Sequence, residues 1–94
     1  MIIVKHFNMT DRHLQQDFQG KIFNIDGIKR ECYYCTLEDG GAWIWLRPND
    51  DNDDTDCDKI NFVVKSKYDL DSLFKQVRNN EFINSEDYGY LDFQ

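Results

Sequence analysis

The pair Asp26-Gly27 constrains the fold of this chain most strongly, because it separates two segments rich in apolar and β-branched residues, 21–25 and 28–36. Both positions of a two-residue hairpin turn need a positive φ, which glycine adopts without strain and aspartate tolerates better than most residues. The pair therefore predicts a β-hairpin, and the middle third of the chain is expected to be an antiparallel meander.

Further strands are expected on both sides of this hairpin. Residues 42–46, Ala-Trp-Ile-Trp-Leu, follow Glu-Asp-Gly-Gly at 38–41, which predicts a second hairpin with a longer loop, and Pro48 is expected to end that strand. Residues 59–65 alternate apolar and polar side chains, as in a strand with one buried face. Residues 1–8 are expected to contain a strand, because they carry the β-branched run Ile-Ile-Val.

Two helices are expected, over residues 11–19 and 69–80. The second has apolar side chains at positions i, i+3, i+4 and i+7, which form one stripe: Leu70, Leu73, Phe74 and Val77. Asp69 is its expected N-cap, and Tyr68 is expected to staple against Leu73. For the first helix the expected N-cap is Thr10, whose hydroxyl can accept a bond from a free N–H of the first turn.

These patterns predict an α+β fold: one small domain over residues 1–94, with a mostly antiparallel sheet of about five strands and two short helices packed on one side. The expected order is β-α-β-β-β-β-α. Two segments stand apart from it, an acidic loop at 48–58 and an acidic and aromatic tail at 81–94. A chain of 94 residues is too short for separate cofactor and substrate domains.

The net charge of -7 disfavours polyanionic partners. Binding to DNA, RNA or anionic lipid depends on Lys and Arg, so direct nucleic-acid binding is disfavoured. No apolar stretch approaches the roughly 20 residues of a membrane span, and the first residues lack the pattern of a signal peptide. Three cysteines, an odd number, fit a reducing compartment. We therefore expect a cytoplasmic protein, located in the host cytoplasm if a phage encodes it.

The acidic loop is the strongest functional feature. It holds six aspartates within eleven residues: Asp50, Asp51, Asp53, Asp54, Asp56 and Asp58. In an extended segment such residues can present a row of carboxylates to a basic protein groove that normally holds phosphates. The alternatives are a solvated loop and an irregular, weak calcium site. An EF-hand is excluded, because a register starting at Asp51 puts Asp56 where glycine is needed and Phe62 where glutamate is needed.

The chain offers little for catalysis or metal binding. Cys32 and Cys35 form a C-x-x-C motif, but an unbroken strand would point them to opposite faces, so we expect structural thiols rather than a zinc or redox site. Completing a zinc site would require Cys57 and a histidine, His6 or His13, without a second pair at suitable spacing. No catalytic or cofactor motif is present, so we expect no enzyme, no metal and no cofactor.

Four aromatic residues, Tyr33, Tyr34, Trp43 and Trp45, form a cluster on the expected central hairpin and suggest a contact surface. Trp43 and Trp45 lie on one face of their expected strand and apolar residues lie on the other, so the strand is either covered on both sides or exposes one aromatic face. The same alternatives hold for Tyr88 in the tail, beside Glu86 and Asp87. Together with the six aspartates, the residues expected to contact a partner are Trp43, Tyr88, Glu86 and Asp87.

In its small size, acidity and lack of enzyme motifs, the chain is similar to phage-encoded inhibitors of host defence proteins, including anti-CRISPR proteins and other nucleic-acid mimics. The similarity covers size and charge, and it carries over no individual residue. It implies an inhibitor, encoded by a phage or mobile element, that blocks the basic nucleic-acid groove of a nuclease, glycosylase or CRISPR effector. An immunity protein or antitoxin against a basic toxin and a weak calcium-binding domain are the alternatives. These patterns do not distinguish a monomer from a dimer.

Overall fold

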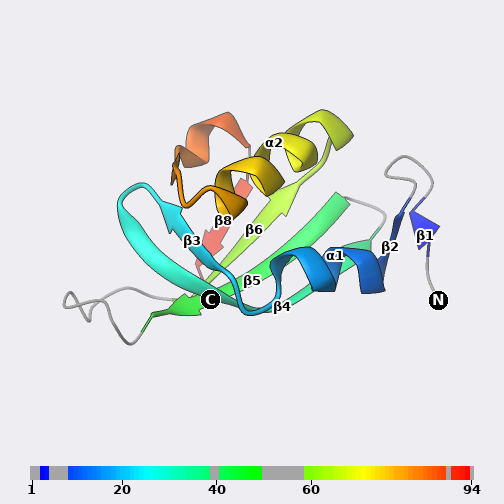
Figure 1. The fold of residues 1–94 in the computed structure, drawn as a ribbon, viewed down its shortest axis with the longest axis horizontal. Coiled ribbons are helices and arrows are strands. Elements are labelled where there is room, and N and C mark those ends of the chain that lie inside the picture. Colours follow the sequence, from blue (N-terminus) through cyan, green and yellow to red (C-terminus); the bar gives the residue numbers. More distant parts are fainter. Residues whose placement is uncertain (1–2, 5–8, 39–40, 50–58, 89, 94) are drawn as a thin grey trace.

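The computed structural model describes residues 3–4, 9–38, 41–49, 59–88 and 90–93. In chain order the elements are β1 (Ile3–Val4), β2 (Met9–Thr10), α1 (Asp11–Phe18), β3 (Ile22–Ile25), β4 (Ile28–Glu38), β5 (Gly41–Pro48), β6 (Ile60–Val64), α2 (Lys67–Arg78), β7 (Phe82–Ile83), the 3-10 helix η1 (Ser85–Asp87) and β8 (Tyr90–Phe93). Both helices lie on one side of a curled sheet (Figure 1). The expected α+β class is confirmed.

The main sheet has six strands in the order β7-β3-β4-β5-β6-β8, one more than the approximate number expected. Its neighbouring strands are antiparallel except β3 and β7, which are parallel. The expected N-terminal strand corresponds to β1, which pairs with β2 in a separate two-stranded ladder. The short strands β7 and β8 come from the tail, for which the residue pattern gave no single prediction.

The β3–β4 hairpin confirms the prediction from its turn residues. Asp26 and Gly27 both have positive φ, 55° and 90°, and Ile25 pairs directly with Ile28. Both hairpins were predicted correctly, but the connection of the second is shorter than expected, because Glu38 of β4 already pairs with Gly41 of β5. The strands therefore continue through two of the four residues assigned to a loop.

Helix α1 lies beside the second half of β4 and takes the place of an edge strand. Strand β3 pairs with β4 only as far as Glu31. Beyond that point Gln15 donates from Nε2 to the Cys35 carbonyl at 3.1 Å, and the Leu37 N–H donates to Asp11 Oδ1 at 2.6 Å. Side chains of the helix thus satisfy backbone groups that would otherwise form an open sheet edge.

The helix caps agree with the sequence for α1 and differ for α2. The Thr10 hydroxyl accepts a bond from the His13 N–H at 3.3 Å, as predicted. The prediction of Asp69 as N-cap of α2 is wrong: Ser66 is the cap, and its Oγ accepts from the Asp69 N–H at 3.0 Å. Asp69 then lies in the first turn, where the helix dipole favours a carboxylate. The predicted staple is also absent, since Tyr68 is 83% exposed.

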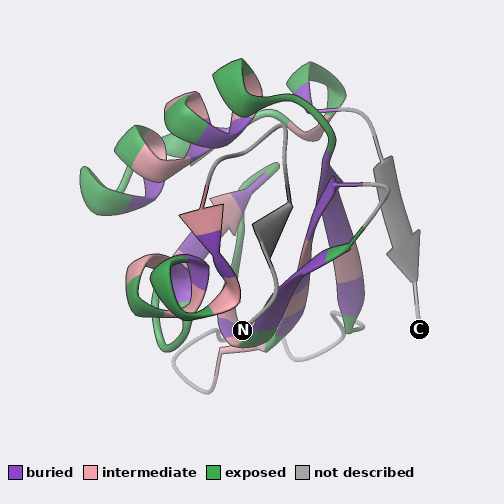
Figure 2. Cartoon of the chain, turned by 90° about the vertical axis from the view of Figure 1, so that its right-hand side faces the viewer, coloured by how far each residue is buried: buried purple, intermediate pink, exposed green. Residues whose placement is uncertain are grey.

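The core lies between the helices and the concave face of the sheet, and Figure 2 shows the buried faces directed there. Helix α2 contributes Leu70, Leu73 and Val77, with Phe74 packed at the margin, so the predicted stripe is confirmed. The main sheet contributes alternate residues of its central strands, including Ile44, Leu46, Ile60, Phe62 and Val64. Because these positions alternate along each strand, the residues between them face the convex side.

Candidate functional site

The six aspartates expected to contact a partner lie in residues 50–58, outside the described residues. The described strands on either side show which elements this segment joins. Strand β5 ends at Pro48 and β6 begins at Ile60, and these two strands are antiparallel neighbours. The acidic segment therefore connects the strand that carries Trp43 and Trp45 to the strand beside it. The proposed calcium site falls on the same segment.

Two of the other predicted residues, Glu86 and Asp87, are exposed on η1. Together with Asp69 of α2 they line a pocket of about 540 Å³, in which Lys65 is the basic residue. The fold thus brings the acids of the tail to the first turn of α2. A surface with three carboxylates and one ammonium attracts cationic groups.

Tyr88 is a core residue and not an exposed contact. Its side chain is 6% exposed, and its ring packs against Phe62 with centroids 5.6 Å apart. Its hydroxyl donates to the Gln76 side-chain oxygen and is hydrogen-bonded to the Ser72 hydroxyl. Burial raises the pKa of the phenol above its ordinary value. The structure gives Tyr88 a structural role, which joins the tail to α2 and β6.

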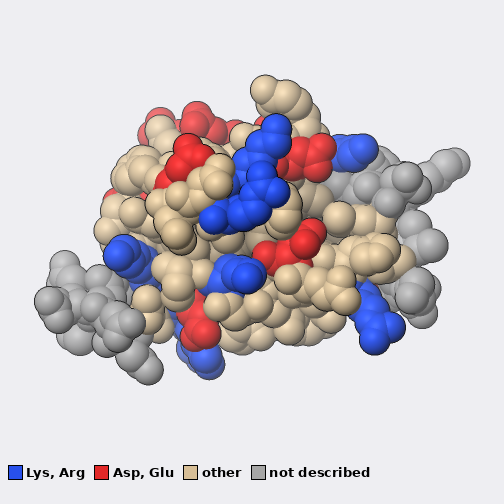
Figure 3. Space-filling model, viewed as in Figure 1, with Lys and Arg blue, Asp and Glu red and all other residues tan. Residues whose placement is uncertain are grey.

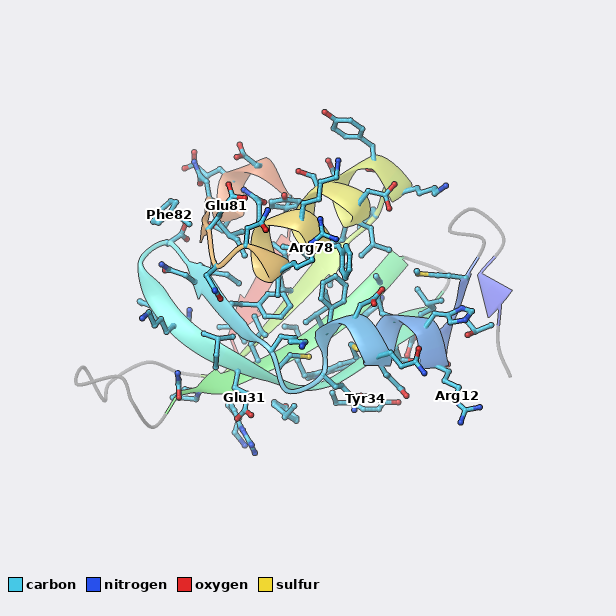
Figure 4. The ribbon with its side chains drawn as sticks, viewed as in Figure 1. Arg12, Glu31, Tyr34, Arg78, Glu81 and Phe82 are labelled. Atoms are coloured by element: carbon cyan, nitrogen blue, oxygen red, sulfur yellow. The ribbon has the colours of Figure 1, made fainter. Side chains whose placement is uncertain are left out.

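The convex side of the sheet carries a cluster of aromatic side chains, which we call the aromatic face: Tyr34 of β4 with Trp43 and Trp45 of β5. The Tyr34 and Trp45 ring centroids are 5.3 Å apart, and the two indoles stack at 6.1 Å. Tyr34 is 45% exposed and both tryptophans are partly exposed. Figure 4 shows Tyr34 on the side of β4 away from α2.

One end of the aromatic face is basic. The ring of Tyr33 lies 6.0 Å from the Arg47 guanidinium carbon and 5.7 Å from Lys59 Nζ. Arg47 also forms an ion pair with Glu31 at 2.9 Å. Cation–π contacts of this kind at exposed sites contribute on the order of 0.5–1 kcal/mol and help to fix both partners. Tyr33 therefore lies between two basic side chains, next to Tyr34 in the sequence.

The expectation that Cys32 and Cys35 point to opposite faces is wrong. The pairing of β4 with β5 shifts between Cys32 and Tyr34, so Tyr33 is an extra residue in a β-bulge. A bulge resets the alternation, and both cysteines are fully buried on the core side. The Cys32 thiol donates to the Tyr34 carbonyl at 3.5 Å. Cys57 lies outside the described residues.

We expect both buried thiols to be unreactive in the native protein. The hydrogen bond with Cys32 and burial raise the pKa of Cys35 well above its ordinary range, so it carries no thiolate at neutral pH. Iodoacetamide at pH 8, followed by peptide mass spectrometry, should leave Cys32 and Cys35 unmodified and label them after denaturation in guanidinium. Rapid labelling of either cysteine without denaturant would contradict the burial described above.

Within the described ranges, no three His, Cys, Asp or Glu side chains are grouped so that they could hold a metal ion. His13 is exposed on α1, and His6 lies outside these ranges. None of the helices described is long and apolar enough to cross a membrane.

No family model, curated protein or solved structure matches this chain. The function must therefore be inferred from the surface itself. Tyr34, the most exposed member of the aromatic face, was expected in the aromatic cluster, but only Trp43 of that cluster was predicted as a contact residue. The bulge places Tyr34 there, and no turn or glycine signal in the sequence marks that bulge. A groove between the C-terminal ends of α1 and α2 was also not predictable from local patterns, because its residues come from three separate elements.

Proposed function

We propose that the chain is a small protein-binding inhibitor that occupies the basic nucleic-acid groove of a defence protein or a DNA- or RNA-processing enzyme. The aromatic face is the observation that carries this proposal. Tyrosine and tryptophan side chains that pack against one another provide a large, rigid contact area at low entropic cost, and such residues dominate the energetics of protein interfaces. A chain with a net charge of -7 favours a basic protein as the partner over a nucleic acid.

Acidic and aromatic residues would contribute to different steps of binding. The acids would attract the partner over a distance: these are the six aspartates of residues 50–58 and the pocket acids Asp69, Glu86 and Asp87. Such steering raises the association rate and weakens as salt is added. The aromatic face would then slow dissociation, because tightly packed aromatic contacts act mainly on the off-rate.

A capture experiment tests the proposal. The immobilised chain is exposed to a lysate, bound proteins are eluted along a salt gradient, and each is identified and assayed for nucleic-acid binding. We expect a basic nucleic-acid-binding protein that elutes as salt rises and whose DNA or RNA competes with the chain for the same site. Partners that bind the chain and their nucleic acid simultaneously would contradict the proposal.

Changing Asp53, Asp54 and Asp56 together to asparagine should abolish inhibition of that target. The melting temperature should stay the same or rise, because fewer like charges repel one another on the segment. Inhibition is measured as the concentration that halves nucleic-acid binding by the target, and unfolding by circular dichroism.

A second triple variant gives the matched control. Asp17→Asn, Asp71→Asn and Glu81→Gln change the net charge by the same amount on the helix-bearing side of the molecule. We expect this control to inhibit within a few-fold of the native chain. If the two triple variants lose inhibition equally, total charge and not the segment 50–58 determines binding.

A further inference from the structure

A groove of about 450 Å³ lies between the C-terminal ends of α1 and α2, on the helix-bearing side of the molecule. Its apolar wall is formed by Phe74 and Val77 of α2 and Ile22 of β3. Phe74 and Ile22 are only partly buried, so apolar surface faces the groove. The Phe74 ring is held edge-on against the core residue Phe18, with centroids 6.2 Å apart. This wall is therefore preformed.

The charged residues of the groove are Lys21, Arg78 and Asp17. In the described part of the chain neither Lys21 nor Arg78 forms an ion pair, and both are exposed. Arg78 lies between the two helices (Figure 4), with its guanidinium carbon 5.3 Å from the Phe74 ring centre. Figure 3 shows basic side chains gathered over α2 and just below it. The lining thus carries an excess of positive charge on a chain that is acidic as a whole.

Arg78 also lies in the last turn of α2, where the helix dipole favours a cation. That interaction leaves the guanidinium in solvent, with its forked N–H donors available to an oxyanion. The groove thus combines an apolar wall, about as large as an aromatic ring, with the guanidinium of Arg78 and the ammonium of Lys21. Such a site is complementary to a molecule that has an apolar body and a carboxylate.

We propose that this groove binds a small carboxylic acid with an apolar, ring-sized body. The body would lie against Phe74, Val77 and Ile22, and the carboxylate would accept hydrogen bonds from Arg78 and Lys21. Asp17 would oppose the same carboxylate by repulsion. This site is independent of the proposed inhibitor function, since the aromatic face lies on the other side of the sheet.

The proposal is tested with 2-naphthoate as the probe and 2-naphthamide, its neutral analogue of the same shape. The full chain, labelled with ¹⁵N, is titrated with each compound and followed by NMR. We expect saturable shifts of the amide signals of residues 16–22 and 74–80 with the acid, and at least about fivefold weaker binding of the amide, because it lacks the charge-assisted hydrogen bonds.

Single substitutions of charged residues then measure how much each one contributes to 2-naphthoate binding. Arg78→Gln and Lys21→Gln should each weaken 2-naphthoate binding about three- to fivefold, the range of partly exposed ion pairs. Asp17→Asn should strengthen binding, because it removes a repulsive charge. Lys67→Gln, at the other end of α2, makes the same charge change as Lys21→Gln outside the groove and should leave affinity within twofold.

Several results would overturn the proposal: no saturable shifts in the groove, equal affinity for the acid and the amide, or a loss with Lys67→Gln as large as that with Arg78→Gln. Tighter binding of a tetrapeptide ending in phenylalanine than of 2-naphthoate would also overturn the assignment to a small free acid. The inhibitor proposal is unaffected by each of these results, because none of these substitutions changes the aromatic face or residues 50–58.

Discussion

Replacing Gly41 by alanine is expected to lower the free energy of unfolding by about 2 to 4 kcal/mol, the combined effect of overpacking and backbone strain. Gly41 has φ 133°, which side chains rarely adopt, and a Cβ built there would lie 2.3 Å from the Val64 carbonyl oxygen. The obstacle is backbone of β6 and cannot rotate away. The β5–β6 pairing would have to shift at the strand that carries both tryptophans.

For a chain of this length the loss is a large part of a total stability on the order of 10 kcal/mol. The midpoint of thermal unfolding should fall by about 10 to 25 °C, measured by circular dichroism. Gly27→Ala is the matched control, because Gly27 also has positive φ, 90°, but nothing lies within 4 Å of the added Cβ. It should cost about 1 kcal/mol. Equal losses in the two variants would show that strain alone, without the clash, accounts for the effect at Gly41.

Local signals in the sequence were sufficient to predict much of this fold. The pair Asp26-Gly27 predicted a turn with two positive φ values, and the structure has both. The spacing of Leu70, Leu73 and Val77 predicted the buried side of α2. These features were predictable because each depends on neighbouring residues alone. The N-cap of α2 was misassigned since two capping residues, Ser66 and Asp69, lie three positions apart and either can begin a helix.

The candidate sites were less predictable because they depend on contacts between elements. The bulge at Tyr33 follows from how β4 pairs with β5, and it reverses the expected orientation of Cys35 relative to Cys32. Tyr88 was expected either to cover a face of the sheet or to contact a partner and was named as a contact residue beside Glu86 and Asp87, whereas its ring packs against Phe62 in the core. The composition of a segment can be derived from the sequence. The burial of a single side chain cannot, because it depends on how the rest of the chain packs around it.

Substituting Tyr34 by alanine is expected to weaken binding to the captured target by about 2 kcal/mol, or roughly 30-fold, the size of a hot-spot contact. Tyr34 is the best residue for this test, because its ring packs against Trp45 yet it keeps 45% of its surface exposed. The substitution removes the area that the Tyr34 ring would bury against the partner, and it leaves Trp43 and Trp45 unchanged. The affinity is measured by calorimetry, and most of the change should appear in the dissociation rate.

Tyr68→Ala is the matched control, since Tyr68 is another exposed tyrosine, 83% accessible, but lies on α2 rather than on the aromatic face. It should leave affinity within about twofold, as surface substitutions outside an interface do. The salt dependence of binding separates the two kinds of contact: Tyr34→Ala should keep the slope of affinity against salt, whereas the triple asparagine variant should reduce it. Unchanged affinity in Tyr34→Ala would remove the aromatic face from the interface and leave charge as its basis.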